Sequence, residues 1–436
     1  MEKLFRLREH GTTIRKEILA GITTFLTMAY ILAVNPNMLQ ATGMNSGGVF
    51  TATVLASAIA TLVMAFAANL PVALAPGMGL NAYFTYSVVL GMGYSWQLAL
   101  TAVFLEGILF IILSFLNVRE AIIRAIPANL KKAVAVGIGL FIALIGMANA
   151  GFVVNDAGTI IGLGALVGKE PFVHATPALL ALIGLAIIII LYSLRVPGAI
   201  LIGILATTII GIPLGITQIG KGFSPVSLPA APLFLRFEFN NVLTFKFFTV
   251  FFTFLFVDIF DTVGTLVGVT TQAGLIDEKG EIPKVKQALI ADAVGTVAGA
   301  ALGTSTVTSY VESTAGVAAG GRTGLTALST SILFLAALFL SPLFLIIPSA
   351  ATAPALIFVG FLMMKAVTGI DFSDPAEGIP AFLAIIMMPF AYSIAEGIVY
   401  GVLSFVILKA VTAKYREISV VTWVIFVIFV LRFFIK

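Results

Sequence analysis

Three carboxylates lie in apolar stretches of the chain: Asp258, Asp261 and Glu312. The first two fall within FFTFLFVDIFDTVGTLVGV (251–269), which is long enough to cross a bilayer, and the third closes the Thr/Ser-rich part of GTSTVTSYVESTAG (303–316). A carboxylate at membrane depth costs about 3 kcal/mol or more, so such residues face a bundle interior, a cavity or a partner. We predict a polar site for a ligand that enters the membrane, with protons as a second ligand.

Asp258 and Asp261 are three residues apart, so on a helix they share a face. One could accept hydrogen bonds from N–H groups of a substrate while the other carries a proton, because a carboxyl group removed from water can stay protonated near neutral pH. The structural alternative is a pair of acids bonded to Thr262, to Thr265 or to the backbone of a broken helix.

Glu312 follows Ser309 by three residues, which is the spacing of a capping box. A capping role and a ligand role are compatible, because the carboxylate has two oxygens. Asn81 takes the matching place in the first half of the chain, after Gly77-Met-Gly79-Leu80. Its amide both donates and accepts, as the edge of a heterocycle requires, although it could equally cap a helix.

Weaker candidates surround these residues. Phe260, beside Asp261, could stack on a flat substrate, and Ser313, beside Glu312, is a further substrate-binding candidate. Asp292 is interpreted as structural.

Composition bounds the class of protein. The chain has 436 residues, of which 60% are hydrophobic and only 10% charged, whereas soluble proteins carry about 25% charged residues. It is therefore expected to be an all-α polytopic membrane protein. The sequence contains no Cys and two His, which excludes thiolate sites and disfavours a His-rich metal or haem site. We expect no metal, no cofactor beyond a proton gradient and no nucleic-acid partner.

Apolar segments mark the expected spans. They fall at 17–36, 49–69, 72–87, 97–117, 130–149, 176–193 and 198–211, then at 247–268, 285–302, 306–320, 323–341, 353–368, 379–391 and 393–410, with a last segment at 419–435. Lys and Arg fall in alternate connections if the N-terminus is cytoplasmic. This requires two short spans joined at Pro389–Ser393, and it makes 419–435 an interfacial helix.

The two halves resemble each other. IPANLKKAVAVGIGLF (126–141) is similar to IPSAATAPALIFVGFL (347–362), and an odd number of spans per half requires the second copy to be inverted. Inverted repeats with broken helices are typical of secondary transporters. Spans 3 and 10 are expected to be broken: Pro76-Gly77 and Thr304–Val311 predict extended pieces that meet, with half-helices resuming near Leu80 and Tyr310.

A family resemblance rests on four motifs. PGMGLNAYF (76–84), FVDIFDTVGTLVG (256–268), residues 291–325 and AEGIVYGVLSF (395–405) together resemble the AzgA-like purine permeases, a branch of the nucleobase–cation symporters that include xanthine and uracil permeases. The likeness covers nearly the whole chain. It implies fourteen spans as two inverted seven-span repeats, with core and gate domains that often dimerise through the gate.

The resemblance also implies domain limits. The core domain would comprise residues 1–125 and 246–345, the gate domain residues 126–245 and 346–412, and residues 413–436 would form the C-terminal interfacial helix.

Site roles follow from the same likeness. Asp261 matches the substrate-binding acid of span 8, Glu312 the acid of span 10 that holds the base, and Gly79 and Asn81 the span-3 positions tied to specificity. Asp258 is the additional acid of this branch, and Asp258, Asp261 and Glu312 are the proton-coupling candidates.

The sequence therefore predicts a proton-coupled symporter of the cell membrane. It would import guanine, hypoxanthine or adenine by alternating access. The alternatives are a permease for another nucleobase (xanthine or uracil) or an anion carrier of the same fold, and the three acids disfavour the latter. A membrane-embedded enzyme lacks its metal cluster or nucleophile–base set, and a channel would pass current without substrate.

Overall fold

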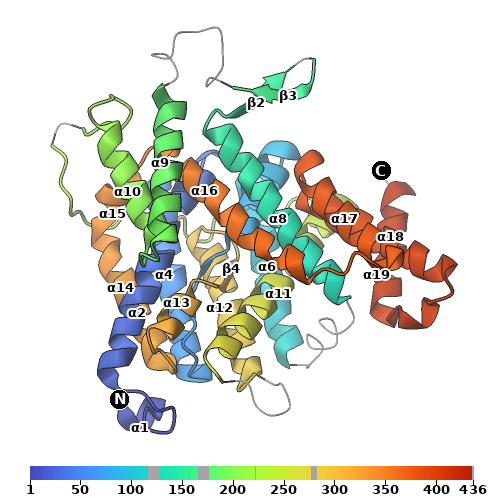
Figure 1. Cartoon of the computed structure of the whole chain (residues 1–436), viewed down its shortest axis with the longest axis horizontal. Coiled ribbons are helices and arrows are strands. Elements are labelled where there is room, and N and C mark those ends of the chain that lie inside the picture. The colour runs from blue at the N-terminus through green and yellow to red at the C-terminus, as the bar shows by residue number, and fades with distance from the viewer. Residues whose placement is uncertain (116–126, 157, 165–175, 221, 276–281, 435–436) are drawn as a thin grey trace.

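The computed structural model describes residues 1–115, 127–156, 158–164, 176–220, 222–275 and 282–434. These residues are almost entirely helical, with two short antiparallel ribbons (Figure 1). In the first half the elements are α1 (Glu2–Phe5), α2 (Ile14–Met28), α3 (Ile31–Gln40), α4 (Ser46–Val63), η1 (Met64–Ala68), β1 (Leu74–Pro76), α5 (Met78–Ala82), η2 (Tyr83–Gly91), α6 (Trp96–Phe115), α8 (Ala128–Asn149), β2 (Val153–Asp156), β3 (Ile160–Leu163), α9 (Thr176–Ser193) and α10 (Ala199–Gly211).

The second half repeats this order. Its elements are α11 (Phe245–Gln272), α12 (Val285–Leu302), β4 (Val307–Ser309), α13 (Ser313–Ala318), α14 (Gly324–Ala337), η4 (Leu338–Leu340), α15 (Ser341–Leu345), α16 (Ser349–Met364), η5 (Lys365–Gly369), α17 (Pro375–Phe390), α18 (Ile394–Val411), η6 (Tyr415–Glu417) and α19 (Val420–Phe434). In the described residues, nine helical segments are long and apolar enough to cross a membrane, and the shorter apolar helices include α9, α10 and α17. Together with the two broken spans they give the expected fourteen segments.

The two broken spans meet as predicted. β1 pairs with β4 in antiparallel register, with Leu74 opposite Ser309 and Pro76 opposite Val307. The pairing continues on both sides, because Gly77 N donates to Thr306 O at 3.0 Å and Tyr310 N donates to Ala73 O at 3.0 Å. Pro76 interrupts helix formation and the β-branched Thr and Val residues of β4 favour extended backbone. Two short strands are thereby tolerated inside a helical membrane protein, because their backbone groups pair with each other.

The half-helix starts lie within a few residues of the sequence prediction. The first begins at Met78, close to Leu80, and the second begins at Ser313, three residues after Tyr310. The capping box expected from Ser309 and Glu312 is wrong: Ser309 belongs to β4, and Glu312 is itself the N-cap residue of α13 and makes no side-chain cap hydrogen bond. The strand pairing keeps Ser309 extended, so the helix starts later than its local spacing suggests.

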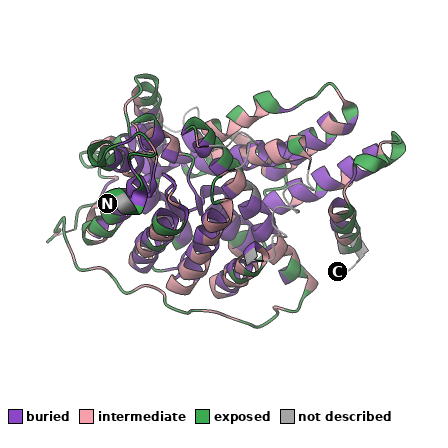
Figure 2. Cartoon of the chain, turned by 90° about the horizontal axis from the view of Figure 1, so that it is seen from below, coloured by how far each residue is buried: buried purple, intermediate pink, exposed green. Residues whose placement is uncertain are grey.

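The helices pack as two sets. The core set has α12 against α4 and α6, α11 and η2 against α6, α2 and α4 against α14, and α13 against α2. The gate set has α8 against α16 and α17, α17 against α18, and α9 against α10 and α16. Buried residues concentrate where helices face one another, and exposed ones are found mainly on outer faces and in connections (Figure 2). The expected reversal between two short spans is confirmed, since α17 ends at Phe390 and α18 begins at Ile394.

The C-terminal helix α19 follows the gate set. Phe429 is buried and its ring meets that of Phe252 on α11 at a centroid distance of 6.2 Å. Val420, Val424 and Val427 are exposed along the same helix. Its position in the bilayer interface stays a prediction.

Candidate functional site

A large cavity lies between the two helix sets. Its volume is about 1320 Å³. The core set lines it with α2, α13 and the end of α11, through residues that include Thr23, Thr27, Glu312 and Gln272; the gate set contributes the α9–α10 connection and α16. Tyr192, Arg195 and Lys365 also line the cavity and are exposed. The volume is sufficient for a drug-sized molecule.

The cavity opens on a side that faces away from the β2–β3 hairpin. α8 ends and α9 begins beside this hairpin, and the far end of α9, where Tyr192 and Ser193 line the cavity, lies about midway along the molecule (Figure 1). In Figure 1 the hairpin lies at the top and the N-terminus at the bottom. We call these the hairpin end and the N-terminal end. The exposed lining residues at the end of α9 form the cavity mouth, which lies on the side away from the hairpin end.

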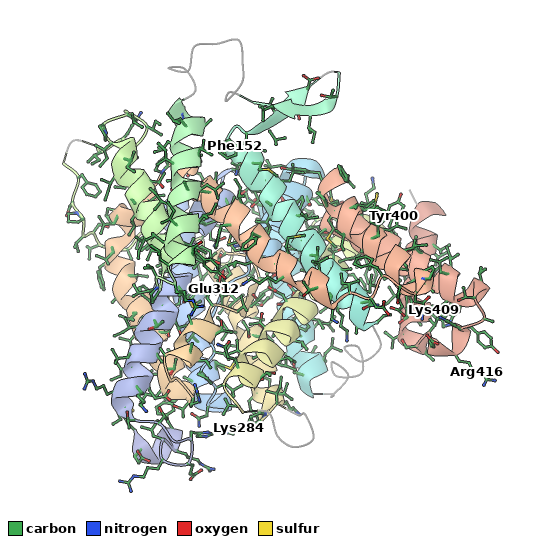
Figure 3. All side chains as sticks on the ribbon, in the orientation of Figure 1. Phe152, Lys284, Glu312, Tyr400, Lys409 and Arg416 are labelled. Carbon is green, nitrogen blue, oxygen red and sulfur yellow. The ribbon has the colours of Figure 1, made fainter. Side chains whose placement is uncertain are left out.

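Glu312 is positioned at the inner part of this cavity. Figure 3 shows it about midway between the hairpin end and the N-terminal end. The strand β4 and the half-helix α13 meet at this residue, and Tyr30 OH donates to Glu312 Oε1 at 2.6 Å. Thr27 Oγ1 donates to the Glu312 carbonyl at 3.3 Å. One neutral donor thus orients the carboxylate while its side chain lines the cavity.

Asp261 lies behind the paired strands. Thr308 Oγ1 on β4 donates to Asp261 Oδ2 at 3.2 Å. Gly77 lies close to both side chains. A Cβ atom at this position would lie 2.9 Å from Thr308 Oγ1 and 3.5 Å from Asp261 Oδ2. The described cavity lining includes Glu312 and not Asp261. Of these two acids, only Glu312 therefore lines the present opening.

Asp258 points to a different neighbour from Asp261. It is fully buried, and Thr262 Oγ1 is 3.4 Å from Asp258 Oδ1 and 2.6 Å from Asp292 Oδ1 on α12. The hydroxyl has one proton and can donate to only one carboxylate at a time. The structure thus separates the two span-8 acids that the sequence placed on one helix face, because a three-residue step still turns the helix by about 60°.

Two further candidates, Asn81 and Ser313, lie within the packed core. Asn81 is fully buried, accepts a very short hydrogen bond from Ser305 Oγ, and its Nδ2 donates to Pro76 O at 3.4 Å. Ser313 Oγ accepts from Ala73 N at 3.0 Å. Both side chains link the two repeats beside the strand pair.

Gly79 and Phe260 complete the predicted set. A Cβ atom on Gly79 would come within 2.7 Å of Ile138 Cγ2, so this glycine allows α5 to approach α8 of the gate set. The side chain of Phe260 lies outside the described residues. In the described part of the chain, no three His, Cys, Asp or Glu side chains gather to hold a metal ion.

Two tyrosines were missed by the sequence reasoning. Tyr30 supplies the donor to Glu312, and Tyr310 OH donates to Pro76 O at 2.6 Å. Both side chains are almost fully buried. The available signal was a hydroxyl-bearing aromatic residue inside an otherwise apolar span, since a buried tyrosine requires a hydrogen-bond partner.

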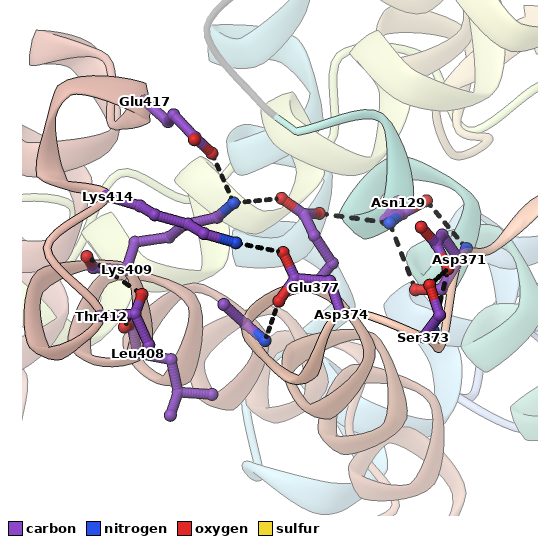
Figure 4. Close-up of polar contacts among 11 residues, drawn as sticks. Asn129, Asp371, Ser373, Asp374, Glu377, Leu408, Lys409, Thr412, Lys414 and Glu417 are labelled. Atoms are coloured by element: carbon purple, nitrogen blue, oxygen red, sulfur yellow. Dashed lines mark hydrogen bonds and ion pairs between the residues drawn. The ribbon is translucent and has the colours of Figure 1, made fainter.

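A second polar cluster ties the gate set together away from the cavity. Lys409 is 2% exposed and pairs with Glu377 at 2.8 Å and with Glu417 at 2.6 Å (Figure 4). Lys414 pairs with Asp374 at 2.7 Å, and Asn129 Nδ2 donates to Glu377 Oε2 at 3.2 Å. A buried lysine is stable only when its charge is paired. The cluster therefore joins α8, α17 and α18 at one end of the gate set.

Comparisons with known proteins agree over the full chain. The model of the xanthine/uracil permease family, described as "Permease family", matches residues 15–430. The chain is 45% identical over 441 residues to the guanine/hypoxanthine permease PbuO of Bacillus subtilis, covering 99% of this chain and 100% of PbuO. It is 43% identical over 435 residues to the adenine permease AdeP of Escherichia coli, covering 99% of this chain and 95% of AdeP.

A solved structure supports the fold. The transmembrane domain of the cyanobacterial bicarbonate transporter BicA superposes with a TM-score of 0.65 at 17% identity, covering 89% of this chain and 97% of that domain. At this identity the likeness concerns the fold alone. The inverted-repeat architecture predicted from the sequence is thereby confirmed.

Proposed function

Because the chain belongs to the xanthine/uracil permease family and is a membrane permease and not an enzyme, we propose that it imports purine nucleobases together with protons by alternating access. Its relatives PbuO and AdeP are guanine/hypoxanthine and adenine permeases. The substrates that these two permeases are named for are all purine bases, which supports this class of substrate here.

The position of Glu312 in the cavity lining is the observation that supports the proposal most directly. An ionised carboxylate only accepts hydrogen bonds, so at the cavity it favours a ligand edge that offers N–H groups. Guanine and hypoxanthine offer a ring N–H, and adenine and guanine offer an exocyclic amino group. Tyr30 holds one carboxylate oxygen at 2.6 Å, which fixes the orientation of the acceptor before the base arrives.

The same carboxylate disfavours the anion carrier. The neighbour of known fold is a bicarbonate transporter, yet an anion would meet Glu312 in the cavity of this chain. Like charges in a medium of low dielectric constant repel strongly. A neutral base with donor groups fits this cavity better than an anion does.

Proton coupling would use the acids of the core set. Asp258, Asp261 and Glu312 are the candidates, and the binding of a proton to one of them removes a charge before the site closes from water. Removing this charge lowers the desolvation cost of the closed state, so that proton and base would cross together. No cofactor other than the proton gradient is needed in this scheme.

The charges at the cavity mouth support an orientation of this conformation in the membrane. Arg195 and Lys365 line the mouth, and short cytoplasmic connections are rich in Lys and Arg. We therefore place the mouth and the N-terminus in the cytoplasm, which makes this conformation inward-open in the cell membrane. A homodimer through the gate set stays a prediction that crosslinking would test.

Uptake into proteoliposomes tests the proposal. Radiolabelled guanine, hypoxanthine and adenine should accumulate when the proton gradient is imposed, and a protonophore should abolish accumulation. Glu312→Gln and Asp261→Asn should each remove most of the uptake, while Glu9→Gln, on a side chain that is 67% exposed, should leave it unchanged. Undiminished uptake in both site variants would contradict the proposal.

A further inference from the structure

The two helix sets are in polar contact at the hairpin end, opposite the cavity mouth. On the core side the contact residues are Tyr86 and Ser87, both on η2; on the gate side they are Asn149 and Tyr392. Asn149 Nδ2 donates to Tyr86 OH at 3.0 Å, and Ser87 Oγ donates to the Tyr392 carbonyl at 3.3 Å. These are two hydrogen bonds between elements of different sets.

Aromatic rings fill the space around these bonds. The Tyr392 ring stands edge-on to Tyr86, with centroids 6.4 Å apart and planes at 85°, and edge-on to Phe141 of α8, at 5.3 Å and 75°. Edge-to-face rings at such distances attract one another. Ser87 is buried at 3% exposure, whereas Asn149 and Tyr392 are exposed, so the contact is closed around Ser87 and meets solvent at its outer edge.

The contact is joined directly to the site. η2 is the continuation of β1 and α5, so the segment that begins in the strand pair next to Glu312 ends on α8 and on the α17–α18 turn. Halfway along it, Gly79 brings α5 against Ile138 of α8. A movement of the core set relative to α8 would therefore change the strand region and this contact together.

We propose that Tyr86, Ser87, Asn149 and Tyr392 form a closing contact, which holds the hairpin end shut while the cavity is open and separates when the site opens the other way. The proposal rests on alternating access in the proposed function. We name these four residues the hairpin-end seal. Without the Asn149–Tyr86 bond, the state open at the hairpin end becomes more populated, because the closed state loses a hydrogen bond that the open state does not make.

The absence of Cys from the chain makes the seal directly measurable. Ser87→Cys introduces a thiol that is buried in the seal, and Ser193→Cys introduces one that lines the cavity mouth. A membrane-impermeant maleimide is applied to each reporter from its own side of vesicles of known orientation. A state open at the hairpin end exposes the first thiol and covers the second.

Tyr86→Phe and Asn149→Ala each remove the same hydrogen bond from opposite partners. Each should speed labelling at residue 87 about fivefold, the factor expected for one neutral hydrogen bond, and slow labelling at residue 193. The double variant should do no more than either single one, since only one bond is lost. Tyr400→Phe, on the partly exposed side of α18, is the matched control.

Equal rates of labelling at residue 87 in Tyr86→Phe and Tyr400→Phe would overturn the proposed seal. Faster labelling at both residue 87 and residue 193 would also overturn it, because it would indicate a general loosening of the structure. The assay uses no purine. A seal that behaves as expected in a protein that transports no purine would therefore refute the proposed substrate and leave the seal intact.

Discussion

The two broken spans have the same topology but different partners at their far ends. Both begin as a short strand in the β1–β4 pair and continue as a half-helix. The first, α5 with η2, reaches the gate set and ends in the hairpin-end seal. The second, α13, starts at Ser313 directly after Glu312, beside the open cavity, and packs on α2 within its own set.

The residues after α13 explain this difference. Glu17 of α2 is fully buried and its carboxylate accepts from the backbone N–H groups of Arg322, Thr323 and Thr326. A carboxylate that receives several N–H donors is strongly held at a helix start. The second half-helix is thus tied to its own set, while the first is tied to the gate set. A conformation that is open at only one end requires the two inverted repeats to make different contacts, as these two do.

The prediction with the largest expected effect concerns the packing of α13 against α2. A Cβ atom on Gly316 would lie 2.7 Å from the Ala20 carbonyl and would also collide with Thr24 Oγ1. Gly316→Ala should lower the free energy of unfolding by about 3 kcal/mol, measured by denaturant titration in detergent. Gly268→Ala, where a Cβ meets nothing within 4 Å, is the control. Equal stability of the two variants would show that α13 is not tied to α2.

Tyr30 bonds to Glu312 at the start of the second half-helix and is not part of the hairpin-end seal. Tyr30→Phe removes the donor to Glu312 Oε1, so the carboxylate loses its fixed orientation. Guanine affinity in isothermal titration should fall about fivefold, which is about 1 kcal/mol. Labelling at the hairpin end should stay as in the unmodified protein. Unchanged affinity would mean that Tyr30 does not position the acceptor.

The smallest effect lies outside both half-helices. Hydrogen bonds from Lys414 and from the Ala376 N–H lower the pKa of Asp374, which caps α17. A carboxyl with a lowered folded-state pKa contributes stability above its unfolded pKa of about 4 and loses it as pH falls further. The thermal midpoint of the unmodified protein should therefore drop slightly more between pH 6 and pH 3 than that of Asp374→Asn. Parallel pH curves would contradict the ion pair's contribution.

Much of the fold was predictable because it is encoded locally. Pro76-Gly77 and the dense run of Thr and Ser after Gly303 disfavour a continuous helix through local propensity. The meeting of the two extended pieces follows from the inverted repeat. The start of α13 was expected a few residues too early because a partner strand more than 200 residues away keeps Ser309 extended. Tyr30 and Glu17 were missed for the same reason: their partners lie near residue 312 and beyond.

The residue types of the site were predictable from the sequence, but the different neighbours of its three acids were not. Charge in an apolar segment identified Asp258, Asp261 and Glu312. Only packing shows that Asp258 lies near Thr262, whose hydroxyl bonds to Asp292. It shows likewise that Asp261 meets Thr308 and that Glu312 alone of the three acids lines the cavity. Asn81 bonds to Ser305 and Pro76, so its proposed contact with substrate requires another conformation.

Direct binding of guanine to the purified protein tests the central claim, that Glu312 at the open cavity is the acceptor for the base. Glu312→Gln replaces a charged acceptor by a neutral amide. It should raise the dissociation constant of guanine about 100-fold, because a charge-assisted hydrogen bond of about 3 kcal/mol is lost. Glu9→Gln should bind as the unmodified protein does. A dissociation constant for Glu312→Gln within twofold of the unmodified value would contradict the account.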